Sequence, residues 1–116
     1  MKTVVIVDDD SNSVELNSIY SHKVIGECVI VEFYSAKKAL EYINSNDIDI
    51  LITDHDMPEI TGDYLSHIAK KRNKKTKTIL ISSNAYLKIN HSFDLQLLKP
   101  LHFEDFKREL LILLSI

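Results

Sequence analysis

The sequence predicts an α/β domain built on a parallel β-sheet, because short apolar segments alternate with longer amphipathic ones along the whole chain. Five segments have the length and apolar composition of strands, and they lie at residues 3–7, 28–33, 48–53, 78–82 and 94–98. Four others are typical of helices and lie at residues 11–22, 35–45, 62–72 and 102–115. A parallel sheet needs crossover connections between its strands, and these are right-handed in almost all known sheets.

The individual elements differ in how clearly their residues indicate them. The first strand, residues 3–7, is β-branched and nearly all apolar, as expected of a strand that is covered on both faces. Ser35 is a suitable N-cap for the second helix, and good helix formers follow it. The fifth strand, residues 94–98, has the weakest pattern. The last helix is apolar around much of its circumference, so its outer side is either a partner or homodimer surface or a cover for extra core.

The composition limits the classes of protein that need to be considered. A chain of 116 residues is long enough for one domain, which we expect to span 1–116. The net charge of −3 argues against nucleic-acid binding, and no apolar segment approaches the roughly 20 residues that span a bilayer. The single Cys28 and the absence of a signal-peptide pattern predict a cytoplasmic protein. The basic run at 70–77 is interpreted as a solvated loop whose cations suit the end of the preceding helix.

Residues able to bind a cation or an anion follow four of the five predicted strands. They are Asp8-Asp9-Asp10, then Asp54 with Asp56, then Ser82, and finally Lys99. Ligands of an open parallel sheet bind at the carboxyl ends of its strands, so we expect these side chains to meet at one edge. Clustered carboxylates resist joint ionisation unless a cation such as Mg²⁺ is present, although Asp8–Asp10 alone could simply begin a helix. A lysine and a hydroxyl on the opposite side would suit a phosphoryl group.

Four motifs of the chain together resemble the receiver domain of bacterial response regulators, the CheY-like family. They are Val7-Asp8-Asp9, Asp54-x-x-Met57-Pro58-x-x-x-Gly62, Ile79-Leu80-Ile81-Ser82-Ser83 and Leu98-Lys99-Pro100. Their order and approximate spacing match over essentially the whole chain. The resemblance implies a doubly wound, flavodoxin-like sheet of strand order 2-1-3-4-5 with helices on both faces. It also implies a phosphorelay protein that is not a turnover enzyme.

The resemblance also implies a role for each acidic residue. Asp54 is the expected phosphoacceptor, which takes a phosphoryl group from a phosphohistidine to form an acyl phosphate. The expected cofactor is Mg²⁺, with Mn²⁺ as an alternative. Its expected ligands are Asp9 directly, Asp54, the backbone carbonyl of Asp56, and Asp8 through water.

Four further residues match positions of known purpose in the family. Lys99 is expected to pair with Asp54 at rest and with the phosphoryl group afterwards. Ser82 is expected to be the switch hydroxyl that binds the phosphoryl oxygens. Pro100 should follow a cis peptide bond, and Gly62 should occupy a turn before the third helix, where its tolerance of positive φ is useful.

The chain departs from the family pattern between its fourth and fifth strands. The stretch from Ser82 to Lys99 is short by about one helical turn, so we expect the family's fourth helix to be shortened or lost. Gln96 stands where the family often has an aromatic residue, and Tyr86 is only a weak candidate to replace it. His55 should point away from Asp54, to the other face of the sheet.

We expect a stand-alone receiver whose partners are a histidine kinase or phosphotransfer protein and a downstream target protein. Two alternatives remain open at this point. One is a pseudo-receiver that keeps the fold as an interaction module and is never phosphorylated. The other is a haloacid-dehalogenase-type phosphatase that uses Asp54-His55-Asp56, although Met57-Pro58 disfavours it.

Overall fold

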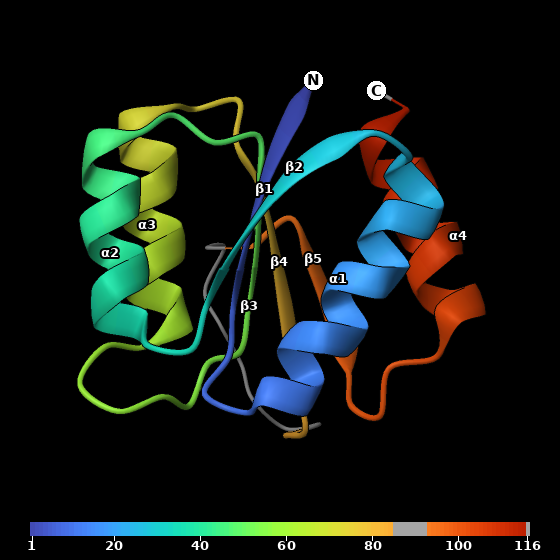
Figure 1. Ribbon diagram of the computed structural model, residues 1–116, viewed down its shortest axis with the longest axis horizontal. Coiled ribbons are helices and arrows are strands. Elements are labelled where there is room, and N and C mark those ends of the chain that lie inside the picture. Colours follow the sequence, from blue (N-terminus) through green and yellow to red (C-terminus); the bar gives the residue numbers. More distant parts are fainter. Residues whose placement is uncertain (85–92, 116) are drawn as a thin grey trace.

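The computed structural model describes residues 1–84 and 93–115 and shows a five-stranded parallel sheet of order β2-β1-β3-β4-β5. Helices α1 and α4 cover one face of the sheet, and α2 and α3 cover the other (Figure 1). In chain order the elements are β1 (Lys2–Val7), α1 (Ser11–Ile25), β2 (Cys28–Phe33), α2 (Ala36–Ser45), β3 (Ile50–Thr53), α3 (Gly62–Arg72), β4 (Lys77–Ser82), β5 (Leu95–Leu98) and α4 (Phe103–Leu114). The predicted fold class and strand order are confirmed. The expected shortening of a helix concerns residues 85–92, which lie outside the described residues.

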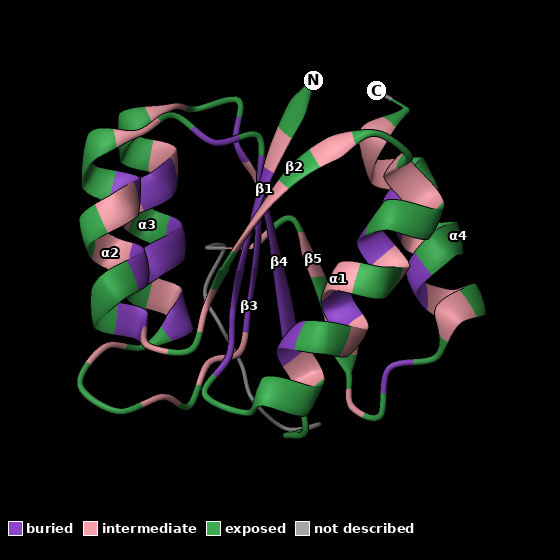
Figure 2. Ribbon diagram, viewed as in Figure 1, coloured by how far each residue is buried: buried purple, intermediate pink, exposed green. Residues whose placement is uncertain are grey.

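The three inner strands form the core, and Figure 2 shows them buried along most of their length. Strand β3 is buried at each of its positions, and β1 at its last four. Two apolar clusters result, one under α1 and α4 and one under α2 and α3. Because both faces of these strands are covered, they lack the polar–apolar alternation of a half-exposed sheet.

Local signals place the starts and ends of the helices. Ser35 caps α2 as predicted, and its hydroxyl accepts a hydrogen bond from the backbone N–H of Lys38. Helix α1 continues to Ile25 rather than ending at residue 22. It is ended by Gly26, which adopts a φ of 83° while its N–H bonds the carbonyl of His22. No helix among the described residues is long and apolar enough to cross a membrane.

The last helix turns one apolar side inward and leaves another in solvent. Phe106 and Leu110 are completely buried against the sheet. Tyr20 of α1 packs on the ring of Phe103 at 5.1 Å between centroids, which joins the two helices. Leu111 and Ile112, in contrast, are 47% and 58% exposed. Covering the core therefore accounts for the inner residues of α4 but not for these two.

Asp94 connects the start of β5 to its neighbours. Its Oδ2 accepts hydrogen bonds from the backbone N–H of Thr78, at 2.8 Å, and from Nζ of Lys70, at 2.7 Å. Burial alone would raise the pKa of this carboxyl, but the hydrogen bonds and the charge of Lys70 outweigh it and lower the pKa. A carboxyl whose pKa is lowered on folding stabilises the folded state above its unfolded pKa, and that contribution disappears as the pH falls.

Replacing Asp94 with asparagine should therefore destabilise the protein by about 1 kcal/mol at pH 7, because a partly exposed ionic hydrogen bond is lost. Urea unfolding followed from neutral pH to about pH 3 should show the difference from wild type shrink below about pH 4, where the carboxyl is protonated. Asp47→Asn is the control, since it also removes the carboxylate of an ion pair, the one with Arg72, but at an exposed site. A pH-independent loss for Asp94→Asn would contradict this role of its charge.

Candidate functional site

The acidic residues that follow β1 and β3 meet at the carboxyl edge of the sheet. Carboxylate oxygens of Asp8, Asp9 and Asp54 all lie within 4.8 Å of one another. Nζ of Lys99, directly after β5, lies 2.8 Å from Oδ2 of Asp8 and 3.4 Å from Oδ2 of Asp54. The structure thus brings together four residues that the sequence placed at the ends of three strands.

The three consecutive aspartates have different surroundings. Asp8 is buried, and its two oxygens accept hydrogen bonds from the N–H of Asp10 and from Lys99. Asp10 begins α1, where its side chain accepts from the N–H of Asn12 and from the hydroxyl of Ser13. The exposed carboxylate of Asp9 makes no hydrogen bond with the described residues. The helix-start interpretation of this cluster is therefore correct for Asp10, and the site interpretation fits the other two.

A backbone hydrogen bond fixes the position of Asp54, and its carboxylate lies close to those of Asp8 and Asp9. Its N–H donates to the carbonyl of Val7, which extends the pairing of β3 with β1 by one residue. Oδ1 accepts from the N–H of His55 at 2.8 Å, and the side chain is 14% exposed. Lys99 is expected to pair with Asp54, and it contacts both acids, at a shorter distance to Asp8.

Burial and charge pull the pKa values of the site in opposite directions. Burial raises the pKa of the Asp8 carboxyl, and the hydrogen bonds from Lys99 and from the backbone of Asp10 offset only part of this. Burial would lower the pKa of Lys99, but the hydrogen bond and charge of Asp8, with the charge of Asp54, raise it overall. Lys99 therefore stays charged at neutral pH, and its contribution to stability is lost only at strongly alkaline pH.

Ser82 and Pro100 lie at the same edge. Ser82 is buried at the end of β4, its hydroxyl oxygen accepts from the N–H of Asn84, and its carbonyl accepts from the N–H of Lys99. The register pairs Ser82 with Leu98, so the residue after Leu98 is carried to the site by the sheet itself. The peptide bond between Lys99 and Pro100 is cis, as the sequence predicts.

Gly62 is required for a different reason from the one expected. Its φ is not positive; the positive value in this loop belongs to Glu59, at 72°. A Cβ on Gly62 would lie 2.1 Å from the carbonyl oxygen of Asp54, far inside van der Waals contact. The expectation of a positive φ at Gly62 is thus wrong. Glycine is required here because the start of α3 packs closely against the backbone of Asp54.

The residues next to Asp54 include one that the sequence did not reveal. The hydroxyl of Thr53 donates to the carbonyl oxygen of Asp54 at 2.8 Å. Threonine is common in strands, so nothing in the pattern distinguishes this role. The side chain of Asp56 is 75% exposed, and Nδ1 of His55 lies 3.2 Å from its Oδ1. No hydrogen bond from the described residues occupies the backbone carbonyl of Asp56.

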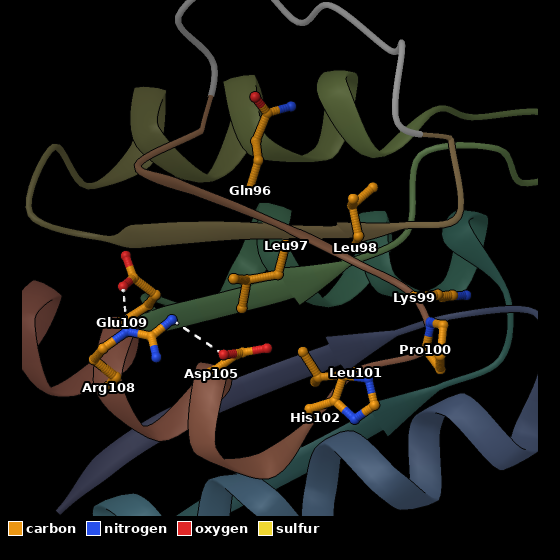
Figure 3. A pocket seen from close by; sticks show the side chains of 10 residues that line it. All are labelled: Gln96, Leu97, Leu98, Lys99, Pro100, Leu101, His102, Asp105, Arg108 and Glu109. Carbon is orange, nitrogen blue, oxygen red and sulfur yellow. Dashed lines mark hydrogen bonds and ion pairs between the residues drawn. The ribbon is translucent and has the colours of Figure 1, made fainter.

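A separate cleft of about 500 Å³ lies between β5 and α4 (Figure 3). Leu97 points towards α4, while Gln96 and Leu98 point to the opposite side of the strand. Arg108 bridges Asp105 and Glu109 on its helical wall. Gln96 is exposed, so the position that often carries an aromatic residue is on the outside of the sheet here.

Comparison with known proteins agrees with this fold. Residues 4–110 match the response regulator receiver domain family, and the chain belongs to that family. Receiver domains of this family are phosphoryl-accepting signalling domains of two-component systems. Among curated proteins, none matches the chain.

Solved structures of receiver domains superpose on nearly the whole chain. Response regulator TrrA of Thermotoga maritima, solved with Mg²⁺ and BeF, is 27% identical with a TM-score of 0.83, covering 98% of this chain and 100% of that one. A CheY-like receiver from Methanospirillum hungatei is 21% identical with a TM-score of 0.85, covering 99% and 94%. The receiver of a Pseudomonas aeruginosa sensor histidine kinase, with magnesium in its active-site cleft, is 12% identical with a TM-score of 0.82, covering 99% and 98%.

Replacing Gly62 with alanine should destabilise the protein by about 1–3 kcal/mol, because the new Cβ must displace the Asp54 backbone or the start of α3. Urea unfolding measures this loss. Asp63→Ala is the matched control, since it introduces alanine at the next position of the same helical turn. Equal stability of Gly62→Ala and wild type would show that the loop does not require the close approach.

Proposed function

We propose that Asp54 accepts a phosphoryl group from a phosphohistidine of a histidine kinase or phosphotransfer protein, in a reaction that depends on Mg²⁺. The observation that supports this most directly is the position of the Asp54 carboxylate. It is partly exposed at the carboxyl edge of the sheet, close to the carboxylates of Asp8 and Asp9 and to the ammonium group of Lys99. Family membership makes this assignment preferable to the haloacid-dehalogenase-type phosphatase.

The proposed transfer uses each of these groups in a defined way. A carboxylate oxygen of Asp54 attacks phosphorus, a P–O bond forms, and the P–N bond to the donor imidazole breaks. The imidazole keeps the electron pair of that bond and takes up a proton. Negative charge grows on the phosphoryl oxygens during transfer, and Lys99 offers an ammonium group to balance it. Ser82 then supplies its hydroxyl to the same oxygens.

The donors of the site fit a hard divalent cation. Three carboxylates converge on a site where Lys99 provides one positive charge, which leaves an excess of negative charge. Asp9 and Asp54 would bind Mg²⁺ directly. The backbone carbonyl of Asp56 accepts no hydrogen bond from the described residues and would be a further ligand. Both oxygens of Asp8 already accept hydrogen bonds, which suits contact through water. Bound Mg²⁺ supplies charge neutralisation for the phosphoryl oxygens.

We propose that this receiver, spanning residues 1–116, acts in the cytoplasm and signals through protein contacts or onward phosphotransfer. The exposed pair Leu111 and Ile112 on α4 supports a contact surface there, with a second copy of the chain as one candidate partner. Phosphorylation would place a dianionic group beside Ser82, and the signal would spread from that hydroxyl.

Incubation of the intact protein with acetyl phosphate and Mg²⁺ should add the mass of one phosphoryl group, measured by mass spectrometry. Asp54→Asn should remove the added mass. Asp10→Asn is the matched control and should keep it, because Asn caps α1 as well as Asp does and the Asp10 carboxylate belongs to the helix start.

A mass shift that survives Asp54→Asn would contradict the proposed acceptor. No shift in the wild type would favour the pseudo-receiver. Continuous turnover of p-nitrophenyl phosphate would instead revive the phosphatase hypothesis.

Without metal, Asp9→Asn should stabilise the protein by up to about 1 kcal/mol, since it relieves repulsion among the three carboxylates. With Mg²⁺ at about 100 times its Kd, the wild type should gain about 2.7 kcal/mol and the variant far less. Urea unfolding in EDTA and in Mg²⁺ measures both effects. An equal response of Asp9→Asn and wild type to Mg²⁺ would exclude Asp9 as a ligand.

A further inference from the structure

In the basic run at 70–77, Lys70 and Arg72 have different surroundings from the last three lysines. Lys70 pairs with Asp94 and donates to the carbonyl of Thr76. Arg72 pairs with Asp47 and donates to the carbonyl of Asn44. These two cations bind acids and backbone carbonyls around the ends of α2 and α3. The ammonium groups of Lys74, Lys75 and Lys77 make no such contact with the described residues.

Lys74, Lys75 and Lys77 instead line a cleft of about 480 Å³ together with Lys2 at the start of β1. Within residues 1–84 and 93–115, none of these four ammonium groups makes an ion pair or a hydrogen bond. Lys77 acts on Asp94 only through its charge. An anion bound in this cleft would therefore meet ammonium groups that are free to pair with it.

The cleft has one acid and an apolar side. Asp49 is the acid, and its Oδ2 already accepts a hydrogen bond from the N–H of Thr3 at 2.8 Å. Leu113 and Leu114, at the end of α4, line the cleft and pack in part against the core. Figure 1 shows the start of β1, the segment before β4 and the end of α4 at the same end of the molecule, away from the carboxyl edge that holds Asp54.

Helix dipoles offer a different explanation for these cations. The helices of a parallel α/β fold end near the amino edge of the sheet, where their C-termini attract positive charge. That explanation fits Lys70 and Arg72, which bind the carbonyl oxygens of Thr76, after α3, and of Asn44, at the end of α2. It does not account for lysines that contact no carbonyl and surround a cleft.

We propose that this cleft, formed by Lys2, Lys74, Lys75, Lys77 and the Leu113–Leu114 side, binds an acidic peptide segment of a partner protein that also carries an apolar side chain. Carboxylates of the segment would meet the lysines, and its apolar residue would contact the two leucines. Among the described residues, the lining contains no aromatic ring and so offers no stacking surface for a nucleotide base. The described lining contains no arginine either, and hence lacks the bidentate group that favours specific phosphate recognition.

The proposed peptide-binding cleft is separate from the residues proposed for phosphoryl transfer. It lies at the amino edge of the sheet, whereas Asp8, Asp54 and Lys99 lie at the carboxyl edge. A partner segment bound here would leave the acceptor carboxylate accessible. Binding should therefore be measurable on the unphosphorylated protein.

Fluorescence anisotropy with a short labelled peptide of alternating glutamate and leucine tests the proposal. The triple variant Lys74→Gln, Lys75→Gln, Lys77→Gln should bind this peptide roughly tenfold more weakly than wild type, because three charge contacts are lost. The matched control is Lys37→Gln, Lys38→Gln, Lys107→Gln, which removes the same charge from exposed positions of α2 and α4. It should bind within about twofold of wild type, since only long-range attraction changes.

Two peptide controls and one competitor identify the ligand chemistry. Glutamine in place of glutamate should abolish binding, and serine in place of leucine should weaken it. An equal loss in both triple variants would overturn the proposal in favour of general charge attraction, as would the absence of peptide binding by the wild type. Tighter binding of inorganic tripolyphosphate, with no preference for leucine over serine in the peptide, would overturn it in favour of a phosphate site. Unchanged labelling of both variants by acetyl phosphate confirms that each is folded.

Discussion

The ammonium group of Lys99 lies between the carboxylates of Asp8 and Asp54, and the other features of the site can be understood from this contact. Within the described part of the chain, no other cation forms an ion pair with either acid. Asp9 adds a third carboxylate, so one positive charge balances a cluster that carries more negative charge than it can neutralise. Such a cluster is destabilising by itself and suits a divalent cation, a phosphoryl group, or both.

The parallel sheet produces this arrangement because all its strands end at the same edge. Pairing continues one residue past β1 and β3, where the N–H of Asp8 bonds Phe33 and the N–H of Asp54 bonds Val7. The two acids are therefore fixed by the same hydrogen-bond ladder that holds the core. Lys99 is placed equally firmly, since its N–H bonds the carbonyl of Ser82 on the neighbouring strand. The hydrogen bonds of the sheet therefore position the backbone at Asp8, Asp54 and Lys99.

Much of this could be predicted from the sequence, since apolar periodicity locates the strands and the strand order brings their ends together. Contacts that depend on distance could not be predicted. The shorter approach of Lys99 to Asp8, the separate role of Asp10 as a helix cap, and the closeness of Gly62 to the Asp54 carbonyl all depend on how loops pack. The sequence likewise does not distinguish the members of the basic run. In the structure, Lys70 pairs with Asp94, whereas Lys74 and Lys75 line a cleft.

Direct chemical mapping tests most clearly whether the Asp54 carboxylate becomes an acyl phosphate, as we propose. Borohydride reduces an acyl phosphate to the corresponding alcohol, so a phosphorylated aspartate becomes homoserine. The protein would be treated with acetyl phosphate and Mg²⁺, reduced, digested and analysed by tandem mass spectrometry. We predict homoserine at position 54 and intact aspartate at positions 8, 9 and 56. Homoserine at any of those three positions, or at none of the four, would contradict the assignment of Asp54 as the phosphoacceptor.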